Sequence, residues 1–185
     1  MSRIPCLGNE ALPESLRSLA QGRVINLYRV LAHAPQSVEQ IARLGAALFT
    51  EGGLSAVDRE LLILTYATGF RSEYEWAQHI PISQAVGVAD EQRAALRRGD
   101  HDAEAFSAAQ RALVAFGAAV AAGPTVDDAC YARLRQHYDD EQVVEALVLA
   151  GFYFLVARVC TVLDVEIDAP EGDEVLRMAQ AMRAG

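Results

Sequence analysis

The sequence is poor in cysteine, and its thiols are not paired. Cys6, Cys130 and Cys160 are the three cysteines in 185 residues, and they lie far apart. They form no CxxC dithiol, no zinc-ligand spacing and no disulfide framework, which excludes the usual signatures of dithiol redox enzymes and of disulfide-stabilised secreted domains. The N-terminal segment also lacks the apolar region of a secretory signal peptide. We therefore expect a cytoplasmic protein with reduced cysteines.

Positive charge is also scarce. Sixteen Lys and Arg residues stand against 25 Asp and Glu residues, which gives a formal net charge of -9. Such a chain repels phosphate backbones and anionic lipid surfaces, so we expect neither nucleic acid nor a membrane as a partner. The longest apolar run, residues 146–157, is shorter than the roughly 20 residues of a membrane-spanning helix. We expect this run to be a buried core helix.

Strand patterns are almost absent. No segment alternates apolar and polar residues between turn signals, whereas apolar residues recur at helical spacing along the chain. This pattern predicts an all-α fold. The length fits one domain, and no repeat or low-complexity linker divides the chain, so we expect a single helical domain over residues 1–185.

Capping residues and breakers predict where the helices begin and end. Pro35 and Gly69 are expected to end the first and third helices, whereas Ser55, Ser72, Asp90 and Thr125 are expected to cap later ones. The expected ranges are 13–34 with a break near Gly22, 37–50, 55–68, 73–85, 90–98, 103–122, 125–137, 139–163, and a short tail helix from Asp173.

The helices on either side of Gly69 should form a hairpin that carries the candidate chemistry. Glu75 and His79 are four residues apart, so they share a helix face and can touch. Glu60 and His79 lie at similar distances from the Gly69 turn, so antiparallel packing could bring them together. A histidine beside carboxylates in an apolar site can transfer protons without metal or cofactor.

Two other interpretations of these residues stay open. Glu60 could simply favour the helix dipole near its N-terminus, while Glu75 and His79 form an ordinary surface pair. Two carboxylates and one imidazole could also bind iron or manganese. Helical di-iron sites use Glu-x-x-His pairs, however, whereas the spacing here is Glu-x-x-x-His. We therefore expect no metal and no cofactor.

The hairpin resembles the carboxymuconolactone decarboxylase and alkylhydroperoxidase D superfamily. The peroxidase branch of that superfamily has the pattern E-x11-C-x2-C-x3-H. On this chain the pattern places its glutamate at Glu60, its two cysteines at Ser72 and Glu75, and its histidine at His79. Both ends of the motif match, and both thiols are absent.

The surrounding residues extend the resemblance over about residues 54–96. The phrase at 74–79, Tyr-Glu-Trp-Ala-Gln-His, is similar to thiol-free members of the superfamily, and the lead-in at 59–64, Arg-Glu-Leu-Leu-Ile-Leu, also fits. The resemblance implies a helical fold of the alkylhydroperoxidase D type with a central hairpin. It also implies a homo-oligomer, a trimer or a hexamer.

The missing cysteines argue against peroxidase chemistry, which needs a thiolate nucleophile and a resolving thiol. The resemblance then implies decarboxylase-like chemistry, with His79 as proton carrier and Glu60 or Glu75 orienting it. Isomerisation, dehydration or lactone opening could use the same groups. A non-catalytic oligomeric protein that binds a ligand is the alternative, as is a member of the peroxidase branch that has lost its redox pair.

Residues that could bind the substrate are less clearly marked. Arg71 and Arg158 are candidates to hold a substrate carboxylate, because the guanidinium fork matches its two oxygens. Trp76 could wall the site beside Glu75, with Tyr74 next to it. Each has a structural alternative: Arg71 as a solvated loop charge, Arg158 as part of an ion pair or interface, and Trp76 as a core side chain.

Overall fold

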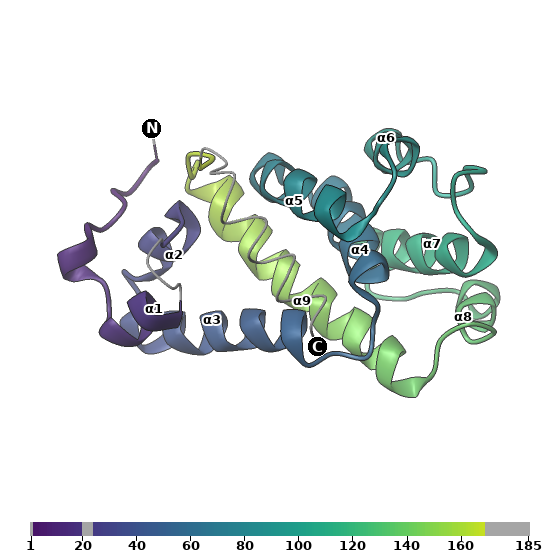
Figure 1. Ribbon diagram of the computed structural model, residues 1–185, viewed down its shortest axis with the longest axis horizontal. Helices are drawn as coiled ribbons and strands as arrows, with labels where there is room; N and C mark the ends of the chain where they lie inside the picture. The colour runs from purple at the N-terminus through teal and green to yellow at the C-terminus, as the bar shows by residue number, and fades with distance from the viewer. Residues whose placement is uncertain (1, 20–23, 169–185) are drawn as a thin grey trace.

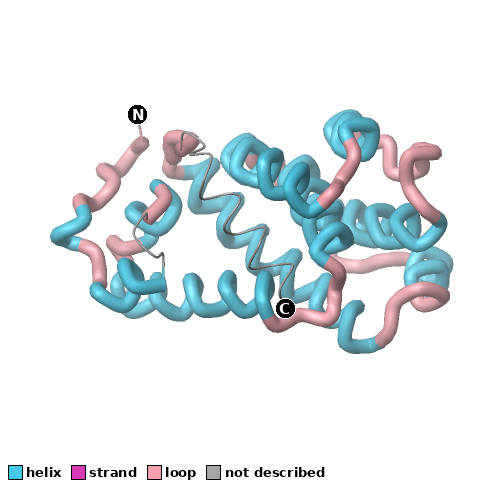
Figure 2. Tube along the Cα trace, in the orientation of Figure 1, coloured by secondary structure: helices cyan, strands magenta, loops and turns pink. Residues whose placement is uncertain are grey.

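The computed structural model describes residues 2–19 and 24–168, and this part of the chain contains helices joined by loops, with no strand (Figures 1 and 2). The predicted all-α class is therefore confirmed. The elements of the described residues are η1 (Asn9–Ala11), α1 (Glu14–Leu19), α2 (Asn26–Leu31), α3 (Pro35–Thr50), α4 (Ala56–Gly69), α5 (Glu73–Val86), α6 (Asp90–Arg98), α7 (Ala108–Ala122), α8 (Asp128–Leu134) and α9 (Asp140–Val162).

Side-chain caps start most of the longer helices where the sequence predicted them. The Ser55 hydroxyl accepts a hydrogen bond from the Asp58 amide at 3.1 Å, and Ser72 accepts from the Glu75 amide. Asp139 caps α9 by accepting from the Gln142 amide at 3.0 Å. These bonds satisfy amides that have no partner within the helix itself.

Four predicted boundaries were wrong. Pro35 is the first residue of α3, a position where a missing amide donor does no harm, and so it opens a helix. The helix predicted from residue 103 begins at Ala108, because Ser107 caps it. Asp127, not Thr125, caps α8, and Asp90 follows the cap of α6. The tail predicted from Asp173 lies outside the described residues.

Helix α4 is the central element of the core. It contacts α5, α6, α7 and α9, and all its residues from 59 to 67 are buried. Its approach to α7 depends on Gly69, because a Cβ atom there would lie 2.6 Å from the Cβ atom of Ala121. A helix that is apolar on nearly every side must be covered on every side, and here four helices cover it.

Helix α9 runs diagonally across the middle of the molecule and contacts α2, α3, α4, α5 and α7 (Figure 1). It extends in both directions beyond the apolar run seen in the sequence. By length and composition alone α9 could cross a membrane, but 50% of its most apolar stretch is buried inside the protein, and core helices have the same composition. Its buried face carries the residues that meet the α4–α5 hairpin.

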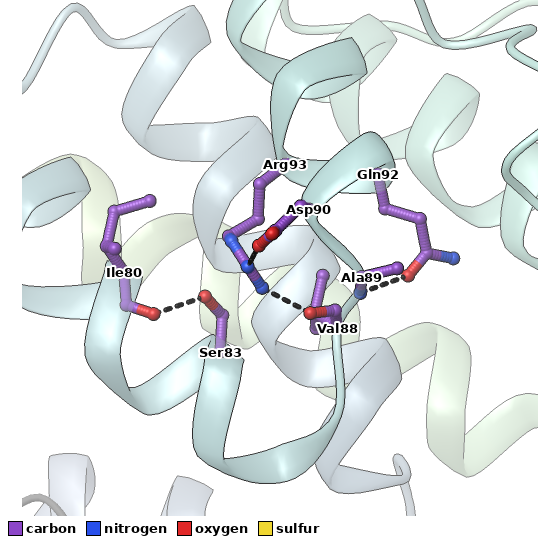
Figure 3. Close-up of polar contacts among 7 residues, drawn as sticks. All are labelled: Ile80, Ser83, Val88, Ala89, Asp90, Gln92 and Arg93. Carbon is purple, nitrogen blue, oxygen red and sulfur yellow. Dashed lines mark hydrogen bonds and ion pairs between the residues drawn. The ribbon is translucent and has the colours of Figure 1, made fainter.

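Side-chain bonds fix the turn between α5 and α6 (Figure 3). Ser83 donates to the Ile80 carbonyl at 2.7 Å within the last turns of α5. After Gly87, which takes a left-handed φ of 103°, Arg93 donates to the Val88 carbonyl and pairs with Asp90. These bonds hold the end of α5, two turns beyond His79.

Candidate active site

The α4–α5 hairpin brings Glu60 and His79 into contact. Helix α4 ends at Gly69, Arg71 takes a left-handed φ of 60°, and Ser72 starts α5, so the connection is only a few residues long. The Oε2 atom of Glu60 lies 2.9 Å from Nδ1 of His79. Glu60 has 0% of its surface exposed and His79 has 7%, so this bond is formed away from water.

Tyr153 of α9 completes a chain of three side chains. Its hydroxyl lies 3.0 Å from Nε2 of His79, on the side of the ring opposite Glu60. Burial, followed by the charges of Glu60 and Glu75, raises the pKa of Tyr153 well above its ordinary value, so the phenol keeps its proton. The phenol can donate to Nε2 while Nδ1–H donates to Glu60, which orients a neutral imidazole.

Sequence analysis did not single out Tyr153. It lies in the apolar run of the last long helix, where its neighbours identify a core helix and nothing more. A signal was present, however: a tyrosine in a run that is otherwise apolar must find a hydrogen-bond partner once its hydroxyl is buried. Which partner it finds depends on how α9 crosses the hairpin.

Aromatic rings hold the imidazole in place from two directions. Phe49, at the end of α3, stacks on the His79 ring with a centroid distance of 6.1 Å and an interplanar angle of 22°. Tyr153 meets the same ring edge-on at 5.3 Å. Together with the bond to Glu60, these contacts leave the ring little freedom to turn.

Glu75 is buried beside these three side chains, and it forms no hydrogen bond to His79. Only 2% of Glu75 is exposed, and neither carboxyl oxygen has a hydrogen-bond partner in the described part of the chain. Burial raises the pKa of Glu75 to about 8, against weaker opposing influences from nearby Ser72 and Arg158. At neutral pH Glu75 is therefore mostly a neutral carboxylic acid, able to donate a proton.

Tyr74 and Trp76 make contacts that stabilise the fold. The Tyr74 hydroxyl donates to Asp168 at 2.6 Å and accepts from the Leu27 amide at 3.2 Å, which ties α5 to the start of α2. The guanidinium of Arg97 lies 4.9 Å from the centre of the Trp76 ring. A role for Tyr74 or Trp76 in substrate binding stays a prediction.

The two arginines singled out as carboxylate anchors lie in different settings. Arg71 is exposed in the hairpin turn. Arg158 of α9 donates to the Phe70 carbonyl and lies over the ring of Phe154 at 5.2 Å. A third arginine, Arg59, is buried next to Glu60 with 3% of its surface exposed, and sequence analysis had treated it only as part of the lead-in to the motif.

The structure also bears on metal binding and on thiol chemistry. In the part of the chain that the structure describes, no three His, Cys, Asp or Glu side chains are grouped so that they could hold a metal ion. Burial raises the pKa of Cys6, Cys130 and Cys160 above the ordinary thiol value. Cysteines with raised pKa values contain little reactive thiolate at neutral pH.

Comparison with known proteins finds a family match over the middle of the chain. Residues 35–117 match the model of the carboxymuconolactone decarboxylase family. No curated protein matches the sequence.

Several solved structures share the fold. An uncharacterised peroxidase-related protein with an alkylhydroperoxidase AhpD core, from Ralstonia eutropha JMP134, is 23% identical with a TM-score of 0.80, over 97% of this chain and 96% of that one. A cysteine-to-alanine variant of the debrominase Bmp8, bound to 2,3,4-tribromopyrrole, is 15% identical with a TM-score of 0.78, over 98% and 100%. A peroxidase-related protein from Silicibacter sp. TM1040 is 18% identical with a TM-score of 0.77, over 91% and 92%. The chain therefore shares the fold of alkylhydroperoxidase D-like proteins, and its residues 35–117, which include the α4–α5 hairpin, match the carboxymuconolactone decarboxylase family.

Proposed function

We propose that the protein is a cofactor-independent acid/base enzyme that acts on a small carboxylated or lactone-like molecule. The observation that carries the proposal is the buried chain Glu60–His79–Tyr153, which lies beside the neutral acid Glu75. A base that is oriented by a carboxylate, close to a separate proton donor, is the arrangement required to move a proton from one atom of a substrate to another.

His79 is the proton carrier in this proposal. Nε2 accepts a hydrogen bond from the Tyr153 hydroxyl, so a proton from a carbon next to a carbonyl or lactone group reaches Nε2 through the phenol: Tyr153 passes its own proton to Nε2 as its oxygen takes the proton of the substrate. Glu60 stabilises the resulting imidazolium through its bond to Nδ1–H. Glu60 thus acts on the substrate through His79, as an orienting group.

Glu75 supplies the second proton. As a neutral acid, Glu75 can protonate the enolate that forms when a proton is removed from the substrate. It can equally protonate the carbon from which a carboxylate has departed as carbon dioxide. In both cases Glu75 becomes a carboxylate. In an isomerisation the proton held by His79 returns to Glu75, whereas in a decarboxylation, where no proton is taken from carbon, Glu75 is reprotonated by water. The same pair of groups serves decarboxylation, isomerisation and dehydration, so the proposal names the proton transfers and the substrate class.

Peroxide reduction through a dithiol fits these residues poorly. Ser72 and Glu75 stand where the peroxidase pattern has its two cysteines, and the three cysteines of this chain have raised pKa values. None of them therefore matches the activated thiolate that such chemistry needs.

Solvent deuterium exchange tests the proposal, because it detects proton transfer at carbon whatever the final product is. The purified protein is incubated in heavy water with levulinate and with unsaturated γ-lactones that carry a carboxylate, and deuterium at the carbons next to the carbonyl is measured by NMR. We expect exchange by the wild type, and a loss of at least about 100-fold in His79→Gln, since general acid/base groups contribute about that much.

His137→Gln is the matched control, because His137 is exposed just after α8. It should exchange like the wild type, and both variants should keep the wild-type helical content. A substrate that binds but neither exchanges nor changes would instead identify a ligand-binding protein. Equal exchange by His79→Gln and the wild type would remove the proposed mechanism.

A further inference from the structure

Arg59 presents a buried and unused guanidinium edge next to the candidate active site. Arg59 is 97% buried, and its Nε and Nη2 atoms have no hydrogen-bond partner in the described part of the chain. These two nitrogens form one edge of the planar group, with parallel N–H bonds that match the two oxygens of a carboxylate. A charged group buried without a hydrogen-bond partner is costly, so an unpaired fork of this kind favours a negatively charged partner that the described residues do not supply.

Arg59 and His79 both pack against the ring of Phe49. The guanidinium carbon of Arg59 is 4.8 Å from the centre of the Phe49 ring, and Phe49 stacks on His79. Arg59 also interacts electrostatically with Glu60 and Tyr153, two members of the chain that orients the imidazole. A group held by Arg59 would therefore lie close to the proton carrier.

The neighbouring acids do not occupy the guanidinium. Oε2 of Glu60 is bonded to His79, and Oε2 of Glu145 accepts from the Leu54 amide at 2.9 Å. One oxygen of each carboxylate has no hydrogen-bond partner among the described residues. Their negative charges disfavour a doubly charged ligand such as phosphate more than a singly charged carboxylate, whose two oxygens match the open edge of Arg59.

We infer that Arg59 binds the carboxylate of the substrate and so sets the specificity of the site for monocarboxylates. The inference rests on the proposed function for the statement that the bound carboxylate belongs to a substrate of His79. It assigns the anchor to Arg59, in place of the exposed Arg71 and of Arg158, which already bonds to the Phe70 carbonyl.

Binding of small carboxylates tests the anchor directly. Acetate, propionate, benzoate and levulinate, each compared with its methyl ester, are titrated by saturation-transfer NMR against the wild type and three variants. The wild type should bind at least one carboxylate more tightly than its neutral ester. Arg59→Gln should weaken that binding at least about tenfold, while Arg71→Gln and Arg158→Gln should retain it.

If Arg59→Gln does not fold, Arg59→Lys is the variant that tests whether Arg59 binds the carboxylate. It keeps the charge but has no planar fork, so it should bind the carboxylate more weakly than the wild type. Failure of all four carboxylates to bind the wild type would overturn the inference. Binding by Arg59→Gln with the affinity of the wild type would also overturn it. If only Arg59→Lys folds, the same result with Arg59→Lys would overturn it.

The exchange assay separates this inference from the proposed function. If carboxylate binding depends on Arg59 but the protein exchanges no protons, Arg59 is the carboxylate anchor and the acid/base mechanism is wrong. Exchange that depends on His79 but is unchanged in the folded Arg59 variant would keep the mechanism and remove the anchor.

Discussion

At the scale of single residues, the unusual feature is an acid that the fold keeps protonated. Glu75 is 2% exposed, and its pKa is raised from the ordinary 4.5 to about 8. The folded state binds this proton more tightly than the unfolded chain does. The associated stability is therefore complete below about pH 4.5 and is lost as the pH rises towards 8.

Glu75→Gln should remove this dependence on pH, because the amide is a neutral group of the same shape. Between pH 5 and 7 the wild type should lose about 2 kcal/mol of unfolding free energy relative to the variant. Urea denaturation at several pH values measures the difference. If the unfolding free energies of the wild type and the variant changed equally with pH, the pKa of Glu75 would not be raised in the folded protein. The variant should also lose deuterium exchange, and exchange by the wild type should decline above about pH 8.

At the scale of the elements, the sequence predicts the hairpin well and the position of α9 poorly. Ser55 and Ser72 cap the helices through bonds to residues three positions on, and Glu60 and His79 meet because they are about equally far from the turn. These relations are local. Tyr153 reaches His79 over 74 positions of sequence, through a crossing of helices that no local pattern encodes.

The lack of hydrogen-bond partners at Glu75 and at Arg59 could not be predicted for a related reason. Spacing places Glu75 and His79 on one helix face, but the rotamer of Glu75 depends on the side chains packed around it. Arg59 was seen in the sequence only as part of the lead-in to the motif, whereas α4 is covered on all sides and buries it. Burial of a polar side chain is decided by tertiary packing, which the sequence pattern does not resolve.

The contact between α4 and α7 yields a test at this scale. Gly69→Ala adds a methyl group that would lie 2.6 Å from the Cβ atom of Ala121, so we expect a loss of about 1 to 3 kcal/mol in unfolding free energy. Gly123→Ala is the control, because a Cβ atom there meets nothing within 4 Å, and it should change stability by less than about 0.5 kcal/mol. Chemical denaturation compares the two, and equal effects would contradict close packing at Gly69.

At the scale of the whole molecule, α9 exposes an apolar face. Six side chains along it are at least 38% exposed: Val144, Leu147, Val148, Phe154, Leu155 and Val162. They recur at helical spacing along one side of α9, and one of them, Phe154, also meets Phe70 of the hairpin turn edge-on at 5.3 Å. Contiguous apolar surface of this kind is typical of protein interfaces.

We predict that this face mediates the homo-oligomer that the family resemblance implies. Light scattering coupled to size exclusion should give a trimer or hexamer for the wild type. Leu147→Glu combined with Phe154→Glu should give a monomer, because two charges would be buried in an apolar contact. Tyr131→Glu, at an exposed aromatic residue of α8, should leave the assembly intact. A monomeric wild type would contradict the prediction.

The chain of Glu60, His79 and Tyr153 takes one side chain from each of three helices. No single helix or isolated hairpin contains the complete set, so the proposed chemistry at His79 cannot begin until distant parts of the polypeptide have docked. A partly folded intermediate would therefore be inert toward metabolites. Substitutions far from the imidazole that loosen this docking would inactivate the protein while leaving every reacting group in place.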